Sequence, residues 1–240
     1  MSMKWTRPAK VPYPAVWHRF QAKAPDSKRL IWYTVQDLPE ERYGDAIQHM
    51  CDHFTRDELM NQAKGLAKDL MAMNDVVTLW KSMLPDRLSL VCFREGSDEV
   101  VGVNILDVVS KSDKDDARFN SAIFQAIYDT IGYVSQQAKI FERYGVDRYL
   151  NAMGLSVHPQ YRGRGIATEI LRARIALCRA VGLKLSSTCF TGPSSQTAAT
   201  RVGFQEDFSI TYGELAVVNR RFSYPGFEEN FCKYMSLKID

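Results

Sequence analysis

The sequence predicts an α/β fold in which helices flank a mixed central sheet. An apolar run from Tyr149 to Val157 precedes a glycine turn, and a helix-periodic stretch follows that turn. Two strand-like segments, residues 88–93 and 100–109, are joined by the short turn Glu95-Gly96-Ser97-Asp98, as in a hairpin. Helices between strands, a hairpin in the middle of the chain and strand patterns near its end are typical of a mixed sheet.

The first half of the chain alternates strand and helix patterns. Residues 1–28 carry aromatic residues among prolines, so we expect an extended N-terminal arm, packed on the surface and too broken for a regular element. β-Branched and aromatic residues predict a strand over Leu30–Val35. Apolar residues on one side predict a helix over 38–54, and a second helix over 75–84 that Pro85 ends.

Helix patterns are longer in the second half. Apolar residues recur every three or four positions from Phe119 to Phe141, which predicts a long amphipathic helix. After the glycine turn, the apolar residues from Ile166 to Leu177 have the spacing of a helix with one buried face. The remaining segments predict a strand over 184–190, a helix over 196–202 with Gly203 as its C′ glycine, and strands over 208–215 and 231–239.

The composition indicates an ordinary globular protein of 240 residues, which we expect to form one domain over residues 1–240. The net charge of +3 is too small to indicate a nucleic-acid partner. No segment approaches the roughly 20 apolar residues of a membrane helix, and the first 25 residues contain no apolar signal-peptide segment. We therefore expect a cytoplasmic monomer that binds neither nucleic acid nor a membrane.

The five cysteines are widely spaced, and no Cys-x-x-Cys pair or Cys/His cluster indicates a zinc site. We expect reduced cysteines that are mostly buried, and no bound metal. Cys189 lies on a predicted strand close to the expected site. Core packing is the simpler interpretation of this residue, and a catalytic thiol is the alternative.

The glycine turn is the part of the chain that indicates a ligand. Gly163 and Gly165 allow a sharp turn and carry no Cβ, so several peptide N–H groups at the helix N-terminus can point at one anion. Arg162 and Arg164 add charge whose planar donors suit phosphate. The turn therefore predicts a phosphorylated cofactor. The alternative is a turn that only caps the helix beside a solvated basic face.

Two common phosphate-binding loops fit these residues poorly. A nucleoside-triphosphate loop needs Lys-Ser or Lys-Thr after its last glycine, where Ile166-Ala167 stands. A dinucleotide fingerprint needs a third glycine or an alanine at the position of Thr168. It also needs a turn that follows the strand directly, and His158-Pro159 interrupts that connection.

The pattern Gln160-x-x-Gly163-x-Gly165, after a strand that ends Leu155-Ser156-Val157, resembles the acetyl-CoA signature of the GNAT superfamily of N-acetyltransferases. Gly203-Phe204 is similar to the pair that closes the core in that family. The resemblance covers about Leu30–Ile239 and implies the GNAT fold, with splayed parallel strands and acetyl-CoA as co-substrate. The cofactor-binding residues that it implies are Leu155, Ser156, Val157, Gln160, Arg162, Gly163, Arg164, Gly165, Ile166, Ala167 and Thr168.

A second stretch, His53 to Asn61, resembles the Phe-x-Asp-Glu-Pro-Leu-Asn stretch of insect arylalkylamine N-acetyltransferases, with Leu59 where that family often has proline. The resemblance implies that Glu58 is the general base, and His53 is the next candidate. Thr55-x-x-Glu58 is also a capping-box pattern, so a purely structural carboxylate is the alternative. We expect Asp57 to cap the same helix.

The resemblance also bears on the group that protonates the leaving thiolate. Many GNAT enzymes use a tyrosine five residues before the closing phenylalanine, and Ala199 stands there. Insect arylalkylamine enzymes are credited with two serines four residues apart, and the matching positions are Thr191 and Ser195. For Ser195 the alternative role is a cap for the helix that begins at Gln196.

Together these residues predict an enzyme that transfers an acetyl group from acetyl-CoA to the primary amine of a small molecule, an arylalkylamine, by direct attack in a ternary complex. Aromatic residues make up 11% of the chain, and those near the predicted pocket suit an aryl group or a cationic amine. The alternatives are acetylation of a polyamine or of a protein amine, and an acyl-CoA-binding module with a degenerate site.

Overall fold

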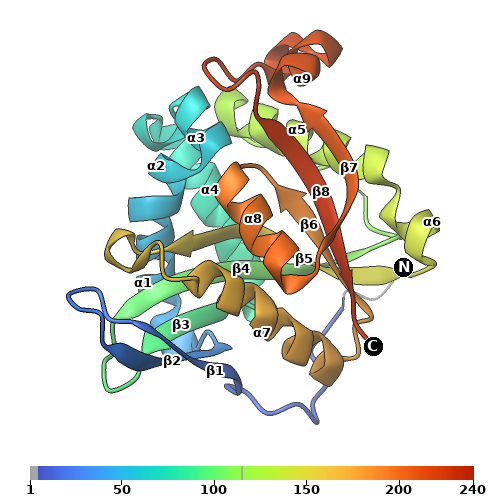
Figure 1. Ribbon diagram of the computed structural model, residues 1–240. Coiled ribbons are helices and arrows are strands. Elements are labelled where there is room, and N and C mark those ends of the chain that lie inside the picture. Colours follow the sequence, from blue (N-terminus) through green and yellow to red (C-terminus); the bar gives the residue numbers. More distant parts are fainter. Residues whose placement is uncertain (1–4, 115) are drawn as a thin grey trace.

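The computed structural model describes residues 5–114 and 116–240, which contain one eight-stranded sheet (Figure 1). The strand order is β1-β2-β3-β4-β5-β6-β8-β7, and β5 with β6 is the parallel pair. The strands are β1 (Val16–Lys23), β2 (Leu30–Asp37), β3 (Leu90–Arg94), β4 (Val100–Ser110), β5 (Arg148–Val157), β6 (Leu185–Phe190), β7 (Gln205–Thr211) and β8 (Phe231–Lys238). The predicted α/β class with a mixed sheet is confirmed.

Helices cover both faces of the sheet (Figure 1). On one face α7 buries Ile170 and Leu177, and on the other α4 and α5 bury Val76 and Ile127. The α-helices are α1 (Tyr43–His49), α2 (Thr55–Asp57), α3 (Leu59–Lys64), α4 (Leu70–Met83), α5 (Ala122–Ala138), α6 (Ile140–Tyr144), α7 (Ile166–Val181), α8 (Pro193–Val202) and α9 (Tyr212–Val218). Within the described residues, none of them is both long enough and apolar enough to cross a membrane.

The expectation that residues 1–28 contain no regular element is wrong, because Val16–Lys23 forms β1 at the edge of the sheet. Residues 1–4 lie outside the described residues. Phe20 and Ala22 are buried, while Gln21 between them and Lys23 after them are exposed, which is the period of a strand. Ahead of the strand, Arg7 pairs with the buried carboxylate of Asp37 at 2.7 Å and fixes the preceding residues.

Three predicted elements divide into shorter ones. The helix predicted over 38–54 is α1 followed by a π-helical turn, Met50–Phe54. The helix predicted over 119–141 breaks at Lys139, whose φ of 50° ends α5 before α6. Of the strand predicted over 208–215, only the residues up to Thr211 belong to β7. A capping box at Thr211 then starts α9 at Tyr212. In the last two cases a cap or a left-handed residue sets the boundary, and apolar periodicity does not reveal either feature.

The parallel strands β5 and β6 separate soon after they begin. Leu150 pairs with Ser186, and Thr188 Oγ1 donates a hydrogen bond to the Ala152 carbonyl at 3.0 Å. Beyond these contacts no further pairing joins the two strands within the described chain. β5 also bulges at Gly154, where φ is 131° and the register against β4 slips. The backbone edge of β5 is therefore left open toward β6.

Gly154→Ala should lower the stability of the fold. A Cβ at this position would lie 2.6 Å from Met50 Cε, and a φ of 131° disfavours any side chain. The expected loss in the free energy of unfolding is about 1–3 kcal/mol, measured by thermal or denaturant unfolding. Gly203→Ala is the matched control, because its φ is 108° but the nearest atom, Leu237 Cδ1, is 3.6 Å away. Equal losses in the two variants would contradict the steric explanation.

Candidate active site

The glycine turn presents bare main chain at the head of α7. Gly163 and Gly165 have φ values of 73° and 80°, and no atom lies within 4 Å of where their Cβ atoms would be. The 16-residue helix starts at Ile166 without a side-chain cap on its first amides. Amides at the N-terminus of a long helix, with open space before them, form an anion site. The turn therefore fits the diphosphate of a CoA derivative.

The two arginines of the turn have protein partners. Arg162 Nη2 pairs with Asp57 Oδ2 at 2.5 Å, and Arg162 Nε donates to the Val157 carbonyl at 2.9 Å. Arg164 Nη2 donates to the Pro25 carbonyl at 3.0 Å. Asp57 thus forms an ion pair across to the turn, and the expectation that it caps a helix is wrong. Both guanidinium groups brace the turn while keeping their charge beside it.

The other predicted cofactor-binding residues surround this turn. Leu155 and Val157 are half-buried at the end of β5, and Ser156 is buried with no hydrogen-bond partner for its hydroxyl among the described residues. Gln160 is exposed, whereas Ile166 and Thr168 are buried, with Ala167 half-buried between them. The turn therefore offers a ligand its main chain more than its side chains.

The Glu58 carboxylate caps α3 and does not form a capping box with Thr55. It accepts hydrogen bonds from the amides of Met60 (3.0 Å) and Asn61 (2.8 Å), while the Thr55 hydroxyl donates to the Cys51 carbonyl. Burial raises the pKa of Glu58, and its hydrogen bonds oppose that shift. The half-buried carboxylate is therefore more basic than a solvated one, as a proton acceptor requires.

Glu58 and Thr191 lie together although they are 133 positions apart in the sequence. Thr191 Oγ1 donates to Glu58 Oε1 at 2.6 Å. The Thr191 carbonyl, just beyond the end of β6, accepts a hydrogen bond from the Tyr212 hydroxyl at 2.7 Å. Ser195, in the first turn of α8, donates to the Gly192 carbonyl at 2.8 Å. The structure thus joins Thr191 to the carboxylate, and Ser195 bonds elsewhere.

Tyr212 and Tyr224 pack against each other in the core, and the Tyr212 hydroxyl holds the Thr191 carbonyl. Their ring centroids are 5.0 Å apart, edge to face, and both rings are buried. Burial raises the pKa of Tyr212 and of Tyr224, so both phenols stay protonated. The sequence predicts Tyr212 within the strand over 208–215 and Tyr224 between two strands, and no pattern indicates that Tyr212 would fix Thr191. The only sequence signal was the density of aromatic residues in this segment.

His53, the other candidate for the base, belongs to a group of three histidines. Its ring centroid is 4.9 Å from that of His49 and 4.8 Å from that of His158. Burial lowers the pKa of His53, and burial together with the neighbouring histidines lowers the pKa of His49 to about 4. Within the described residues no hydrogen bond joins His53 to Glu58 or Thr191. The geometry therefore favours Glu58.

Cys189, for which a catalytic thiol was the alternative, packs beside Cys232 with 3.1 Å between the sulfur atoms. Both thiols are free, and their contact with each other and burial raise the pKa of Cys189. A thiol with a raised pKa is a poor nucleophile at neutral pH. Core packing is therefore the interpretation that the geometry favours.

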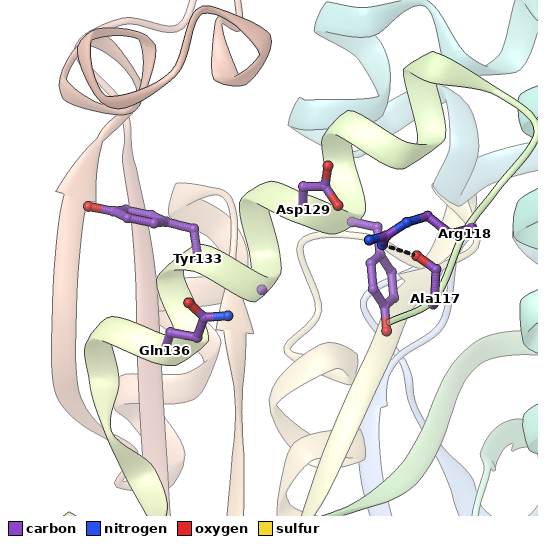
Figure 2. A pocket seen from close by; sticks show the side chains of 7 residues that line it. Ala117, Arg118, Asp129, Tyr133 and Gln136 are labelled. Carbon is purple, nitrogen blue, oxygen red and sulfur yellow. Dashed lines mark hydrogen bonds between the residues drawn. The ribbon is translucent and has the colours of Figure 1, made fainter. Parts of the chain in front are cut away.

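Two surface hollows lie apart from these residues. The one in Figure 2, of about 270 Å³, is on α5 and the loop before it, where Arg118 donates a hydrogen bond to the Ala117 carbonyl. The dashed line in Figure 2 marks this hydrogen bond. The other hollow, of about 960 Å³, lies between Trp5 and the C-terminal end of α7. Neither is lined by the turn or by the Glu58 carboxylate.

A mixed sheet whose parallel strands splay beside a glycine turn and helix fits an acyl-CoA-dependent transferase. The model of the "Acetyltransferase (GNAT) family" matches residues 85–204, and the chain belongs to this family. It has the GNAT fold and is an acetyltransferase that uses acetyl-CoA. No sequence among the curated proteins matches it.

Among solved structures the chain is similar to insect enzymes. An arylalkylamine N-acetyltransferase-like protein, number 7, of the yellow fever mosquito is 80% identical, covers 99% of this chain and 100% of its own, and has a TM-score of 0.98. Arylalkylamine N-acetyltransferase 2 of Aedes aegypti is 20% identical over 87% of this chain and 99% of its own, with a TM-score of 0.75. The polyamine N-acetyltransferase of Drosophila melanogaster is 16% identical over 86% of this chain and 100% of its own, with a TM-score of 0.70. The last two similarities show the fold alone.

Proposed function

We propose that this enzyme acetylates the primary amine of a small molecule, an arylalkylamine, by direct attack of the amine on acetyl-CoA in a ternary complex. The observation that carries the proposal is the hydrogen bond between Glu58 and Thr191, which puts a half-buried carboxylate beside the end of β6. The 80% identical mosquito protein supports the substrate class.

The main chain of the glycine turn binds the diphosphate, and the open edge of β5 over Leu155–Val157 binds the pantetheine arm. Acetyl-CoA supplies an acyl group that is activated as a thioester. Backbone N–H and C=O groups that a neighbouring strand leaves unpaired need partners, and an extended ligand provides them. In this proposal the chain acts as one acetyltransferase domain, a cytoplasmic monomer that binds no nucleic acid. Five free cysteines support that location.

Glu58 accepts the proton that the amine loses before it attacks. An alkylammonium group with a pKa near that of lysine, about 10.4, requires roughly 4–5 kcal/mol to lose its proton at neutral pH. Because burial raises the pKa of Glu58, its carboxylate is a better proton acceptor than a solvated glutamate. The amides of Met60 and Asn61 hold the carboxylate in place during this step.

Thr191 and Ser195 are the proposed donors to the departing sulfur. Ala199 occupies the position at which many GNAT enzymes carry tyrosine, so another hydroxyl must serve. Thr191 already bonds the carboxylate that receives the amine proton. Its hydroxyl can therefore give its own proton to the sulfur and take one from Glu58. The Ser195 hydroxyl must leave the Gly192 carbonyl to take part.

Thiol release from acetyl-CoA, followed across a panel of amines, tests this function. We expect amine-dependent release with arylalkylamines such as dopamine and serotonin, together with N-acetylated products of the matching mass. Faster release with a polyamine or a peptide amine would replace the proposed substrate class. Binding of acetyl-CoA without amine-dependent release would contradict the proposal and indicate a binding module.

Thr191→Val should move the acidic limb of the kcat–pH profile to higher pH. A protonated Glu58 cannot accept a proton, so kcat falls as the pH falls through the pKa of Glu58. The Thr191 hydrogen bond lowers that pKa, and its loss therefore raises the pKa further. Thr191→Ser keeps the hydroxyl and should keep the native limb. Identical limbs in the native enzyme and the valine variant would rule out this coupling.

A further inference from the structure

A buried asparagine and a buried arginine lie behind the bulge of β5. Asn104, on β4, is fully buried and donates from Nδ2 to the Gly154 carbonyl at 2.7 Å. Arg174, on α7, is 1% exposed and donates from Nε to Asn104 Oδ1 at 2.9 Å. Its Nη1 is buried without a hydrogen-bond partner among the described residues. The chain of contacts therefore runs from a buried cation, through an amide, to the peptide of the bulge.

The close packing of α7 on β4 makes this contact possible. A Cβ on Gly102 would lie 2.8 Å from Ile170 Cδ1 and 3.0 Å from the Ser156 carbonyl oxygen, so the glycine favours close packing of the helix on β4. Ile170 stands one helical turn before Arg174, on the same buried face of α7. The arginine is held in the interior by this packing. Burial lowers the pKa of Arg174 to about 10, so the group remains charged at neutral pH.

The same contacts fix the direction of the Leu155 amide. Asn104 on β4 engages the Gly154 carbonyl, which shares a trans peptide with the Leu155 N–H, and the two groups of such a peptide point in opposite directions. The hydrogen-bond pattern between β4 and β5 agrees with this direction. His158 N donates to the Val101 carbonyl of β4, and successive N–H groups of a strand point to opposite sides, so the Leu155 N–H, three residues earlier, points away from β4. The Leu155 N–H therefore points toward β6, into the opening between the parallel strands.

We propose that Asn104 and Arg174 are positioning residues that aim and polarise the Leu155 N–H toward the carbonyl oxygen of bound acetyl-CoA. This inference rests on the proposed function, in which the thioester lies at the open edge of β5. A hydrogen bond to a peptide carbonyl strengthens the N–H of the same peptide as a donor. A buried cation behind that peptide stabilises negative charge that develops in front of it, since the surroundings have a low dielectric constant.

A purely structural role predicts a different response to mutation. Arg174→Met removes the desolvation cost of a buried charge, but it leaves the buried Asn104 Oδ1 without its donor. Because these effects oppose each other, the unfolding temperature should change little while kcat falls. A side chain that served only to hold the fold would lose stability and activity together.

Asn104→Asp is the sharpest test. Aspartate keeps the size of the side chain and gives Arg174 an anionic partner, but it has no N–H to donate to the Gly154 carbonyl. We expect kcat to fall about 10- to 100-fold, with the Kd for acetyl-CoA within about threefold of native. In infrared difference spectra of acetyl-CoA labelled with 13C at the carbonyl, the stretch should move down on binding to the native enzyme. In the variant the carbonyl stretch should return toward its value in free acetyl-CoA.

Asn74→Asp, at an exposed position of α4, is the control for charge and should keep the native stretch.

Two outcomes overturn the inference in different ways. If the native enzyme shifts the carbonyl stretch and Asn104→Asp and Arg174→Met shift it equally, the pair does not act on the Leu155 amide, and the proposed function stands. If the native enzyme binds no acetyl-CoA, the proposed function fails and the inference fails with it. Should Asn104→Asp not fold, the comparison of Arg174→Met with native supplies the same spectroscopic test.

Discussion

Replacing Glu58 with glutamine should lower kcat for an arylalkylamine by about 10²- to 10³-fold at neutral pH. Glutamine keeps the size of the side chain and can accept from one α3 amide, but it cannot take a proton from the ammonium group. The Kd for acetyl-CoA should change little, because the substitution leaves the main chain of the glycine turn unchanged. Steady-state rates at saturating concentrations of both substrates, with calorimetry for the Kd, measure the two quantities separately.

The pH dependence of the Glu58→Gln variant distinguishes a lost base from a damaged fold. Without a base the variant depends on the small fraction of amine that is already neutral, so its rate should rise as the pH approaches the pKa of the amine. Glu142→Gln, at an exposed position of α6, is the matched control and should keep the native rate. A Glu58→Gln enzyme with the full native rate at neutral pH would remove Glu58 from the mechanism.

Gly165→Val should weaken acetyl-CoA binding on the order of 100-fold. The φ of 80° is unfavourable for a β-branched residue, and a Cβ here meets no protein atom within 4 Å, so it projects into the space proposed for the diphosphate. Displacing the ligand from two amides, at about 1.5 kcal/mol for each hydrogen bond to a charged group, gives this factor. Calorimetric titration with acetyl-CoA measures it.

Gly182→Val provides the matched control at the opposite end of the same helix. Its φ of 77° carries the same backbone strain, and a Cβ there also meets no atom within 4 Å. Both variants should therefore lose similar stability, by about 1–3 kcal/mol in the free energy of unfolding. Only Gly165→Val should lose affinity for acetyl-CoA, and an equal loss of affinity in both would attribute the effect to strain alone.

Local patterns in the sequence predicted the part of the fold that carries the glycine turn. The strand predicted over 149–157 is β5, and the helix predicted after Gly165 begins at Ile166. Both succeeded because a buried strand is bounded by proline and glycine, and a helix with one apolar face has a clear period. Gly203 ends α8 with a φ of 108°, as its position after the helix pattern predicted.

Elements whose conformation depends on distant partners could not be predicted in this way. β1 follows a stretch of prolines, and it becomes a strand because β2 offers it an edge. The segment that begins at Tyr212 is a different case, because the capping box of Thr211 and Glu214 that starts a helix there is local. Its Thr-x-x-Glu pattern is present in the sequence, but the strand prediction over 208–215 relied on composition and did not use it.

The sequence predicted single residues of the candidate site but not the contacts between them. Glu58 and Thr191 were each identified by family resemblance, but their contact joins distant segments and depends on the whole fold. A structural role and a catalytic role for Glu58 were also treated as exclusive alternatives. In the structure the carboxylate caps α3 and accepts a hydrogen bond from Thr191 at the same time. Arg174 gave one signal that sequence reasoning missed, since it is a charged residue on the apolar face of a helix.

A crystal structure of the protein with acetyl-CoA bound would show where the diphosphate and the thioester lie. We expect diphosphate oxygens within hydrogen-bond distance of the amides between Gly163 and Ala167. We also expect the thioester between β5 and β6, with its carbonyl oxygen on the Leu155 N–H and its sulfur on the side of Glu58 and Thr191. A complex in which the diphosphate lies away from that turn, or the thioester lies out of reach of Glu58, would contradict this expectation.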